Sequence, residues 1–242
     1  MLTSILSKAT LKKLDISNNK LGDALIFLLS SPGYGNCDLT AAGCKDLANI
    51  TGTKKSCIQM SLILYELGDG GVELLCEGLK DPKCKLQSVL QQNCGMIANS
   101  CGDLATVLST KPSLQDLALD NNNIRGVDLV LLCKGLIHLN CNIQKLWLWE
   151  CHFTAVACKD LANVIGIKES LRRMSLTLNE LGDAGVEMLC QGLKDPKCKL
   201  QFLSLRDSEL TTACCDSLAA VISTKQCLRY LGLDLNRLEM RV

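Results

Sequence analysis

Cysteine residues recur along this 242-residue chain at intervals of 57 positions. Thirteen of the sixteen cysteines fall into four columns of this period: Cys76, Cys133 and Cys190; Cys84, Cys141 and Cys198; Cys37, Cys94 and Cys151; and Cys44, Cys101, Cys158 and Cys215. The 21 residues from Leu67 match the 21 residues from Leu181 at 18 positions. With 47 leucines and only 8 aromatic side chains, the chain has the uniform core typical of many copies of one small unit.

Each 57-residue unit consists of two related halves of about 29 and 28 residues. Both halves open with the pattern LxxLxL, whose alternation predicts a short strand with buried leucines. The expected strand segments begin at Leu11, Cys57, Leu86, Leu114, Ile143, Leu171, Leu200 and Leu228. Because neither half can bury its apolar face alone, we expect stacked units in a curved α/β solenoid, with parallel strands on the concave side and helices on the convex side.

An amphipathic helix is expected after each strand. In the first half-repeat, Asp69 is the expected N-cap, and the buried positions that follow at helical spacing are Val72, Leu75, Cys76 and Leu79. The sequence DPK should end this helix, because the residue before a proline avoids the helical conformation. In the second half-repeat, the expected caps are Thr40 and Thr154, and the buried positions are Cys44, Leu47, Ala48, Cys158, Leu161 and Ala162.

The cysteine spacing favours buried thiols over disulfides or metal ligands. No CxxC pair occurs, and the two histidines, His138 and His152, lack the paired spacing of a zinc site, so no metal or cofactor is expected. Column members two strands apart would lie about 10 Å apart, whereas a disulfide needs Cα atoms within about 7 Å. Free thiols that act as small hydrophobes indicate a reducing compartment.

Charge and hydropathy argue against several classes of protein. The chain has 26 basic and 25 acidic residues, a balance that does not favour nucleic-acid binding. Its longest apolar runs are far shorter than the roughly 18 to 20 residues of a membrane span. The first residues are amphipathic and soon charged, unlike a secretory signal. We therefore expect a cytoplasmic chain without nucleic-acid or membrane partners.

The alternating half-repeats resemble ribonuclease-inhibitor-type leucine-rich repeats, in which Asn and Cys alternate after the strand. The motifs LGDxGVxxLCxGLKDPxCKLQ and LTxxxCxxLA are most similar to the repeat region of the pyrin-containing NACHT leucine-rich-repeat (NOD-like) receptors, including the branch active in oocytes and early embryos. The resemblance covers Leu11 to Asn236 and implies a sensing or scaffolding module of innate immunity or the early embryo. In a whole receptor, such a module can hold its own NACHT domain inactive. No GxxxxGK[ST] phosphate-binding loop occurs in this sequence, so neither a NACHT nor a pyrin domain is expected within it.

We expect residues 1–242 to form one repeat domain of about eight clear repeats with one defective rung. Between Leu11 and Cys57 lie 46 residues rather than 57, and Pro32 falls where a strand residue is expected. These departures predict an irregular rung at residues 22–36. Both ends of the sequence interrupt the repeat, which is compatible with a splice product, a divergent gene copy or a fragment.

The strand pattern also predicts a binding face. The third, fifth, seventh and eighth residues of each LxxLxLxx segment should point into the concavity or lie at its rim, and both tryptophans of the chain occupy such positions. Because Trp and Arg are enriched in binding hot spots, the candidate partner-binding residues are Asp120, Trp147, Trp149, Glu150, Arg173, Phe202, Arg206, Tyr230 and Asp234. The alternative is that the tryptophans only shield the sheet. The charged turns at residues 80–85 and 194–199 recur with the repeat and are interpreted as solvated outer turns.

Three alternatives fit the sequence less well than a protein-binding module of the receptor repeat type. An enzyme is not expected, because no nucleophile, base and orienting acid occur together. A thiol-based redox sensor would depend on Cys214, Cys215 and Cys227, but reactivity requires access and a lowered pKa. A ribonuclease-inhibitor-like binder of cationic enzymes should be strongly acidic, whereas the concave face carries five acidic and three basic side chains, a net charge of −2.

Overall fold

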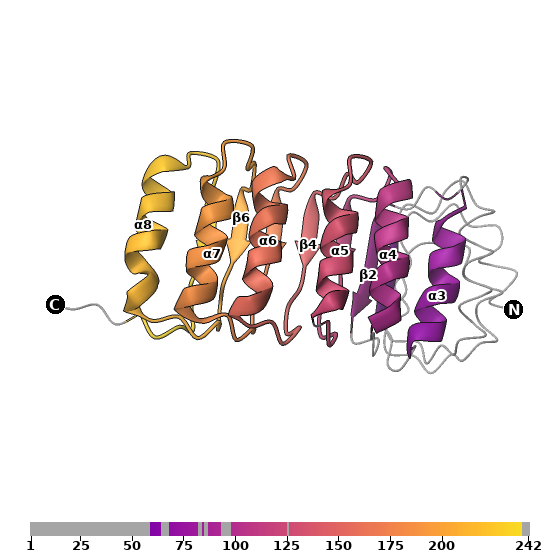
Figure 1. The fold of residues 1–242 in the computed structure, drawn as a ribbon, viewed down its shortest axis with the longest axis horizontal. Coiled ribbons are helices and arrows are strands. Elements are labelled where there is room, and N and C mark those ends of the chain that lie inside the picture. The colour runs from indigo at the N-terminus through magenta and orange to yellow at the C-terminus, as the bar shows by residue number, and fades with distance from the viewer. Residues whose placement is uncertain are drawn as a thin grey trace, which may run out of the picture.

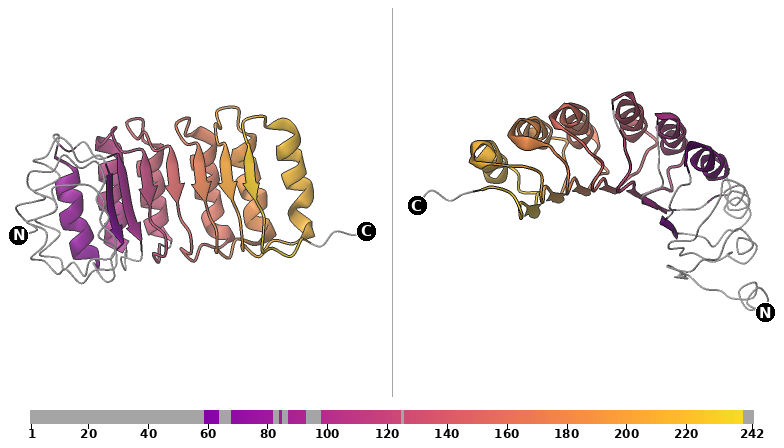
Figure 2. Two further views of the ribbon diagram at one scale, coloured as in Figure 1. Left: turned by 180° about the vertical axis from the view of Figure 1, so that it is seen from behind. Right: turned by 90° about the horizontal axis from the view of Figure 1, so that it is seen from below.

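The computed structural model describes residues 59–63, 68–81, 84, 87–92, 98–124 and 126–238. Over these residues, strands and helices alternate and successive units stack side by side (Figure 1). Seen from its edge, the array is an arc with the sheet along its inner side and the helices along its outer side (Figure 2). The predicted α/β solenoid, with a concave sheet and convex helices, is therefore confirmed.

Seven parallel strands of the described residues form one sheet in chain order. They are β1 (Gln59–Ile63), β2 (Ser88–Gln92), β3 (Asp116–Ala118), β4 (Lys145–Trp147), β5 (Arg173–Ser175), β6 (Phe202–Ser204) and β7 (Tyr230–Gly232). Each strand begins two residues after a predicted start, which confirms seven of the eight predictions; the eighth, at Leu11, lies outside the described residues. Residues at equivalent repeat positions pair directly, as Leu117 does with Leu146 and Leu146 with Met174. Each sequence column therefore becomes a row of neighbouring side chains across the sheet.

The helices cover one face of this sheet. They are α3 (Gly68–Leu79), α4 (Ala98–Thr110), α5 (Val127–Ile137), α6 (Ala155–Ile167), α7 (Gly182–Lys194) and α8 (Cys215–Thr224), with a short 3-10 turn η2 (Thr212–Cys214) before α8. The predicted helix positions that lie in the described part are buried: Val72, Leu75, Cys76, Leu79, Cys158, Leu161 and Ala162. Helix α7 ends directly before the Asp195–Pro196 pair, as predicted from the proline. One continuous core of Leu, Ile, Val and Cys side chains lies between the sheet and the helices.

Asparagine side chains hold the turns that follow alternate strands. Asn179 is buried, and its Oδ1 accepts hydrogen bonds from the backbone N–H groups of Cys151 and Phe153, each at 3.0 Å. Its Nδ2 lies within 3.1 Å of the carbonyl oxygens of Leu148, Leu176 and Thr177. Asn236 makes the corresponding contacts one unit later. A side chain that bonds two successive turns fixes the stacking of the units.

Glycine allows close contact between alternate pairs of helices. A Cβ atom on Gly192 of α7 would lie 2.1 Å from the carbonyl oxygen of Ala162 in α6. A Cβ on Gly135 of α5 would lie 2.5 Å from the Cα of Ala105 in α4. Gly135 and Gly192 are 57 residues apart, and so are Ala105 and Ala162. The helices of α4–α5 and of α6–α7 therefore pack backbone to backbone.

A column of lysines closes the ends of the preceding helices. The Nζ of Lys168, a buried residue, donates to the carbonyl oxygen of His138 at 2.9 Å, directly after α5. Lys111 and Lys225, each 57 residues away, donate to the carbonyl oxygens of Asp81 and Asp195. A cation at a helix C-terminus satisfies carbonyl groups that lack partners within the helix. The sequence reasoning missed this column, although its 57-residue period is visible in the sequence.

Some predicted details differ from the structure or lie outside the described residues. Asp183, the repeat equivalent of Asp69, does not cap its own helix; its carboxylate accepts hydrogen bonds from the N–H and hydroxyl of Thr211 in the next unit. Thr154 occupies the predicted N-cap position of α6, but its hydroxyl makes no capping bond. The predicted irregular rung at residues 22–36 lies outside the described residues, as do Thr40, Cys44, Leu47 and Ala48.

Candidate protein-binding surface

The concave face presents three rows of side chains that cross neighbouring strands. The first row consists of Asp116, Lys145, Arg173, Phe202 and Tyr230, which start strands β3 to β7. The second row contains Trp147 followed by the small residues Ser175, Ser204 and Gly232. The third row lies beyond the strand ends and contains Asp120, Trp149, Thr177, Arg206 and Asp234. The small residues of the second row leave room for the larger side chains beside them.

An aromatic cluster occupies the part of this face formed by β4 to β7. The rings of Phe202 and Tyr230 are stacked, with centroids 4.3 Å apart and planes within 4°. Trp147 meets Phe202 edge to face at 6.2 Å, and the guanidinium of Arg173 lies 5.9 Å from the centroid of the same ring. Tyr230 remains 48% exposed. Four of the predicted binding residues therefore form one continuous surface, in arrangements that stabilise aromatic and cation–π pairs.

Trp149 lies beside a hollow of about 320 Å³ at the end of the strands. Its lining consists of Trp149, Ser175, Thr177, Leu178, Arg206, Asp207 and Leu235. Leu178 and Leu235 are exposed and have φ angles of 56° and 58°, a left-handed conformation that is unusual for a bulky residue. The same conformation occurs at the equivalent Asn121, so the turn itself requires it. The turn thereby directs two leucines and an indole that is 40% exposed into one hollow. The sequence reasoning left Leu178 and Leu235 out of the candidate site.

Several charged groups of the concave face are paired with one another. The carboxylate of Asp116 accepts from the Nζ of Lys145 at 2.9 Å and from the indole Nε1 of Trp147 at 2.8 Å. Arg206 and Asp234 form an ion pair at 2.9 Å, and both side chains are about half exposed. Asp116 fixes the position of Trp147, and the two ion pairs neutralise four of the charged groups of this face locally.

Asp120 does not belong to the exposed surface on which it was predicted. It is only 5% exposed, and its Oδ1 accepts a hydrogen bond from the backbone N–H of Trp149 at 2.8 Å. The alternating pattern predicted an accessible side chain, whereas the carboxylate is bonded to the backbone of the next unit. Glu150 lies next to Trp149 at the rim, is partly exposed and also has a positive φ of 54°. Asp120 therefore positions Trp149, whereas Glu150 is accessible.

The thiols of the described residues are mostly placed where they cannot react. Twelve cysteines lie in this part, ten of them are buried, and none of the twelve forms a disulfide. Burial raises the pKa of the Cys76, Cys133, Cys151 and Cys158 thiols to about 12. A thiol that stays protonated at neutral pH is neither a good nucleophile nor a metal ligand.

The last cysteine of the fourth column is an exception to the predicted burial. Cys215 is exposed, and its neighbour Cys214 takes the buried position, because η2 shifts the start of α8. Over the described residues, no group of three or more His, Cys, Asp or Glu side chains is arranged to hold a metal. In the same part of the chain, no helix is both long enough and apolar enough to cross a membrane.

Comparison with known proteins shows that the units are leucine-rich repeats. The family model described as "Leucine Rich repeat" matches residues 7–24 and 168–190. Mouse ribonuclease inhibitor is 37% identical over 244 residues, which cover 96% of this chain and 53% of that protein. Mouse "NACHT, LRR and PYD domains-containing protein 3" and human "NACHT, LRR and PYD domains-containing protein 12" are each 41% identical, covering 84% of this chain and 20% and 19% of those proteins. The chain thus spans about half of the first relative and about a fifth of the other two.

Proposed function

We propose that this leucine-rich-repeat chain, similar to the repeat regions of the NACHT, LRR and PYD proteins and to ribonuclease inhibitor, is a non-catalytic protein-binding module whose partner docks on the concave face. In this proposal, residues 1–242 act as one repeat domain. A solenoid offers a broad preformed surface, so a partner binds without a large ordering cost. The partner is a protein of unknown identity.

The observation that carries the proposal is the clustering of exposed aromatic and arginine side chains on β4 to β7. One aromatic surface is formed by Trp147, Phe202 and Tyr230 together with Arg173. Trp149 lines a hollow directly beyond the strands. A ring that only shielded the sheet would cover its neighbours, whereas Tyr230 and Trp149 keep nearly half of their surface accessible. Such side chains supply most of the binding energy in typical protein interfaces.

We further propose that the chain belongs to the sensing or scaffolding repeat region of a cytoplasmic NOD-like receptor, with a role in innate immunity or the early embryo. Its support is the identity to two NACHT, LRR and PYD proteins over most of this chain. In a longer receptor chain, the receptor's own NACHT domain is one candidate partner. Nucleic acid and membranes are not among the proposed partners, because the chain has 26 basic and 25 acidic residues and two ion pairs neutralise four charges of the concave face.

Ribonuclease-inhibitor-like binding is the second candidate, favoured by the 37% identity to mouse ribonuclease inhibitor. An inhibitor of cationic enzymes needs a strongly acidic face for electrostatic steering. Here Asp116 and Asp234 are paired with bases and Asp120 is buried, so few free carboxylates remain on the concave face. The thiol-based redox alternative rests on the exposed Cys215 and the partly exposed Cys227, since Cys214 is buried.

The test compares the wild-type chain with a Trp147→Ala, Trp149→Ala double variant in quantitative pull-downs from cells. Losing a hot-spot aromatic costs about 2 kcal/mol or more, so we expect a specific partner to bind the variant roughly thirtyfold more weakly. The matched control is Ile222→Ala, which shortens an exposed apolar side chain on α8, away from the concave face. Thermal unfolding of each variant shows whether the fold is retained.

Because Trp147 also bonds Asp116, a Trp149→Ala single variant separates binding from folding. A partner retained at wild-type affinity by both folded variants would refute the concave site. A partner whose binding depends on the oxidation state of Cys215 rather than on the tryptophans would favour the redox alternative.

A further inference from the structure

Several exposed positions of α5 and α6 are apolar where equivalent positions of other units are polar or small, although Leu131 has the apolar equivalents Leu74 and Met188. Val130 stands where α3 has Glu73 and α7 has Glu187, and all three positions are exposed. Four more apolar residues differ from an equivalent residue 57 positions away. Val127 corresponds to Gly70 and Leu139 to Pro196, while Val156 corresponds to Asn99 and Ile167 to Thr110. Val127, Leu139 and Val156 are 72%, 84% and 82% exposed. Because the neighbouring units show what this position of the fold normally carries, the change is specific to this unit.

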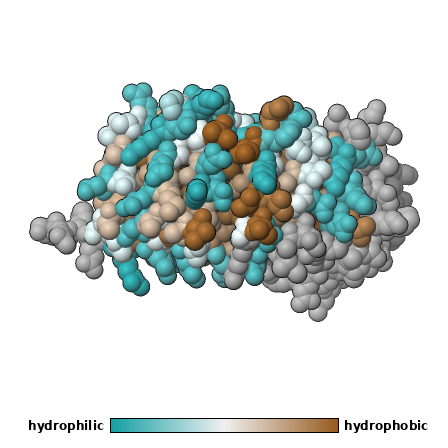
Figure 3. Space-filling model, in the orientation of Figure 1, coloured by the Kyte–Doolittle hydropathy of each residue, from teal (hydrophilic) through white to brown (hydrophobic). Residues whose placement is uncertain are grey.

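We name the exposed apolar side chains of this region the α5–α6 band: Val127, Val130, Leu131, Leu139, Val156 and Ile167. Val127 and Val156 lie at the starts of α5 and α6, and Leu139 and Ile167 lie at or just beyond their ends. Apolar side chains gather near the middle of the helical face, with hydrophilic side chains over the neighbouring helices (Figure 3). An 11-residue helix such as α5 is about 16 Å long, so the band runs for about three helical turns.

An ion pair that joins α3 and α4 has no counterpart between α5 and α6. Lys80 at the end of α3 pairs with Asp103 of α4 at 3.1 Å. The equivalent positions on α5 and α6 are Ile137 and Asp160, so the acid is retained but its lysine is replaced by an apolar residue. Among the described residues, Asp160 has no ion-pair partner. The side chain of Asp160 is partly exposed.

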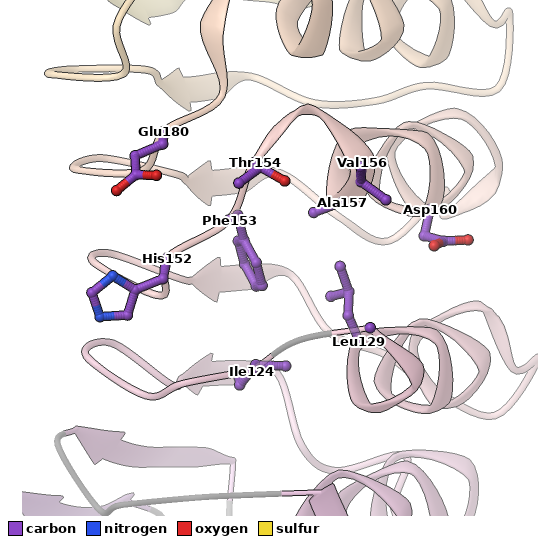
Figure 4. Close-up of a pocket in the computed structure, with 10 residues that line it drawn as sticks. Ile124, Leu129, His152, Phe153, Thr154, Val156, Ala157, Asp160 and Glu180 are labelled. Atoms are coloured by element: carbon purple, nitrogen blue, oxygen red, sulfur yellow. The ribbon is translucent and has the colours of Figure 1, made fainter.

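A pocket of about 340 Å³ opens between the starts of α5 and α6, where no glycine contact holds the two helices together. Ile124, Leu129 and Phe153 provide apolar lining, and Asp160 and Glu180 lie on opposite sides of it (Figure 4). Within the described part of the chain, Glu180 also takes part in no ion pair. A hollow of this size accepts a bulky apolar side chain, and the two carboxylates favour a positive charge beside it.

We propose that the α5–α6 band is a second binding surface, separate from the concave face, and that its occupant is an amphipathic helix of a partner protein. The apolar side of that helix lies along the band and places a bulky side chain in the pocket, with a lysine or arginine facing Asp160 and Glu180. The length of the band matches the repeated anchors of a helix bound in a groove. The carboxylates of Asp160 and Glu180, which form no ion pair with another described residue, favour a basic helix and disfavour an anionic membrane surface.

The test uses a displayed library of random helical peptides, selected on the wild-type chain. A repeat-restored variant, Val130→Glu with Val156→Asn and Ile167→Thr, replaces three band residues by those of equivalent units, so it is expected to fold. An Asp160→Asn, Glu180→Gln variant removes the charge and keeps the shape. The Trp147→Ala, Trp149→Ala variant serves as the control for the concave face. Sedimentation of the peptide-free chains reports self-association.

The proposal predicts selected peptides with a bulky apolar residue next to Lys or Arg at helical spacing. Their affinity should fall about tenfold or more for the repeat-restored variant and severalfold for the Asp160→Asn, Glu180→Gln variant. It should not change for the Trp147→Ala, Trp149→Ala variant. Peptides that bind all variants equally, or a library without band-dependent binders, would overturn it. Self-association of the wild type that the repeat-restored variant abolishes would also overturn it, because a second copy would then cover the band. The concave proposal is unaffected by each of these outcomes.

Discussion

Replacing Asn179 by alanine tests whether the asparagine turns hold the stacked units together. Oδ1 accepts from two backbone N–H groups, and Nδ2 has two hydrogens to donate to nearby carbonyls, so about four hydrogen bonds are lost. At a net contribution of about 1 kcal/mol each, the loss is about 4 kcal/mol. The N–H groups of Cys151 and Phe153 lose this acceptor inside the core, while a water that enters the space would recover part of the loss. We therefore expect the free energy of unfolding to fall by about 3 to 5 kcal/mol, a large part of the roughly 5 to 15 kcal/mol of a typical domain.

Urea denaturation measures the loss, and amide hydrogen exchange locates it at Cys151 and Phe153. Protection of these two amides should fall more than that of amides in β3 or α4. Asn142→Ala is the matched control, because this exposed asparagine donates a single bond to the carbonyl oxygen of Pro112. Its replacement should change stability by less than about 0.5 kcal/mol. If Asn179→Ala costs less than about 1 kcal/mol and leaves the two amides protected, the asparagine does not hold the units together.

Two further predictions concern the helix contacts and the buried thiols. Gly192→Ala should lower the free energy of unfolding by about 1 to 3 kcal/mol in chemical denaturation, because the new Cβ overlaps the backbone of α6. Gly166→Ala, whose Cβ meets the side chain of Asp195 at 3.3 Å and the carbonyl oxygen of Gly192 at 3.5 Å, should change it by less than about 1 kcal/mol. Burial raises the pKa of Cys151 from 9.0 to about 12. Between about pH 9 and 12 the thiol is therefore protonated in the folded chain but loses its proton on unfolding. The free energy of unfolding should be highest below about pH 9 and should fall as the pH rises from about 9 to 12. A melting temperature that stays constant across this range would contradict the burial of the thiols.

The parts of the fold that could be predicted from the sequence are those whose burial repeats with the period. Leu117, Leu146 and Leu203 occupy the same position of the strand, face the same core and pair with their neighbours across the sheet. A residue buried in every unit tolerates little variation, so the repeat remains visible as columns of Leu and Cys. The strand positions and the buried helix faces follow from these columns without further information.

The parts that could not be predicted depend on distances that a hydrophobic pattern does not contain. Alternation predicts that Asp120 is on the concave side of the sheet, but not that its carboxylate bonds the backbone N–H of Trp149 in the next unit. The 57-residue columns of Gly135 and Lys168 were visible, yet their roles require the spacing between neighbouring helices and the direction of a helix C-terminus. The exchange of Cys214 and Cys215 results from a 3-10 turn, which moves the helix by part of a turn.

Positions that differ between equivalent units carry information of another kind. The rows that build the core remain apolar from unit to unit, whereas the first row of the concave face changes from Asp116 through Lys145 and Arg173 to Phe202 and Tyr230. The α5–α6 band differs from the other units in the same way on the opposite side of the molecule. The folding of the array does not require either difference, because the other units fold with different residues at these positions. The two surfaces are separated by the core, so their contributions to binding should add as free energies when one partner contacts both.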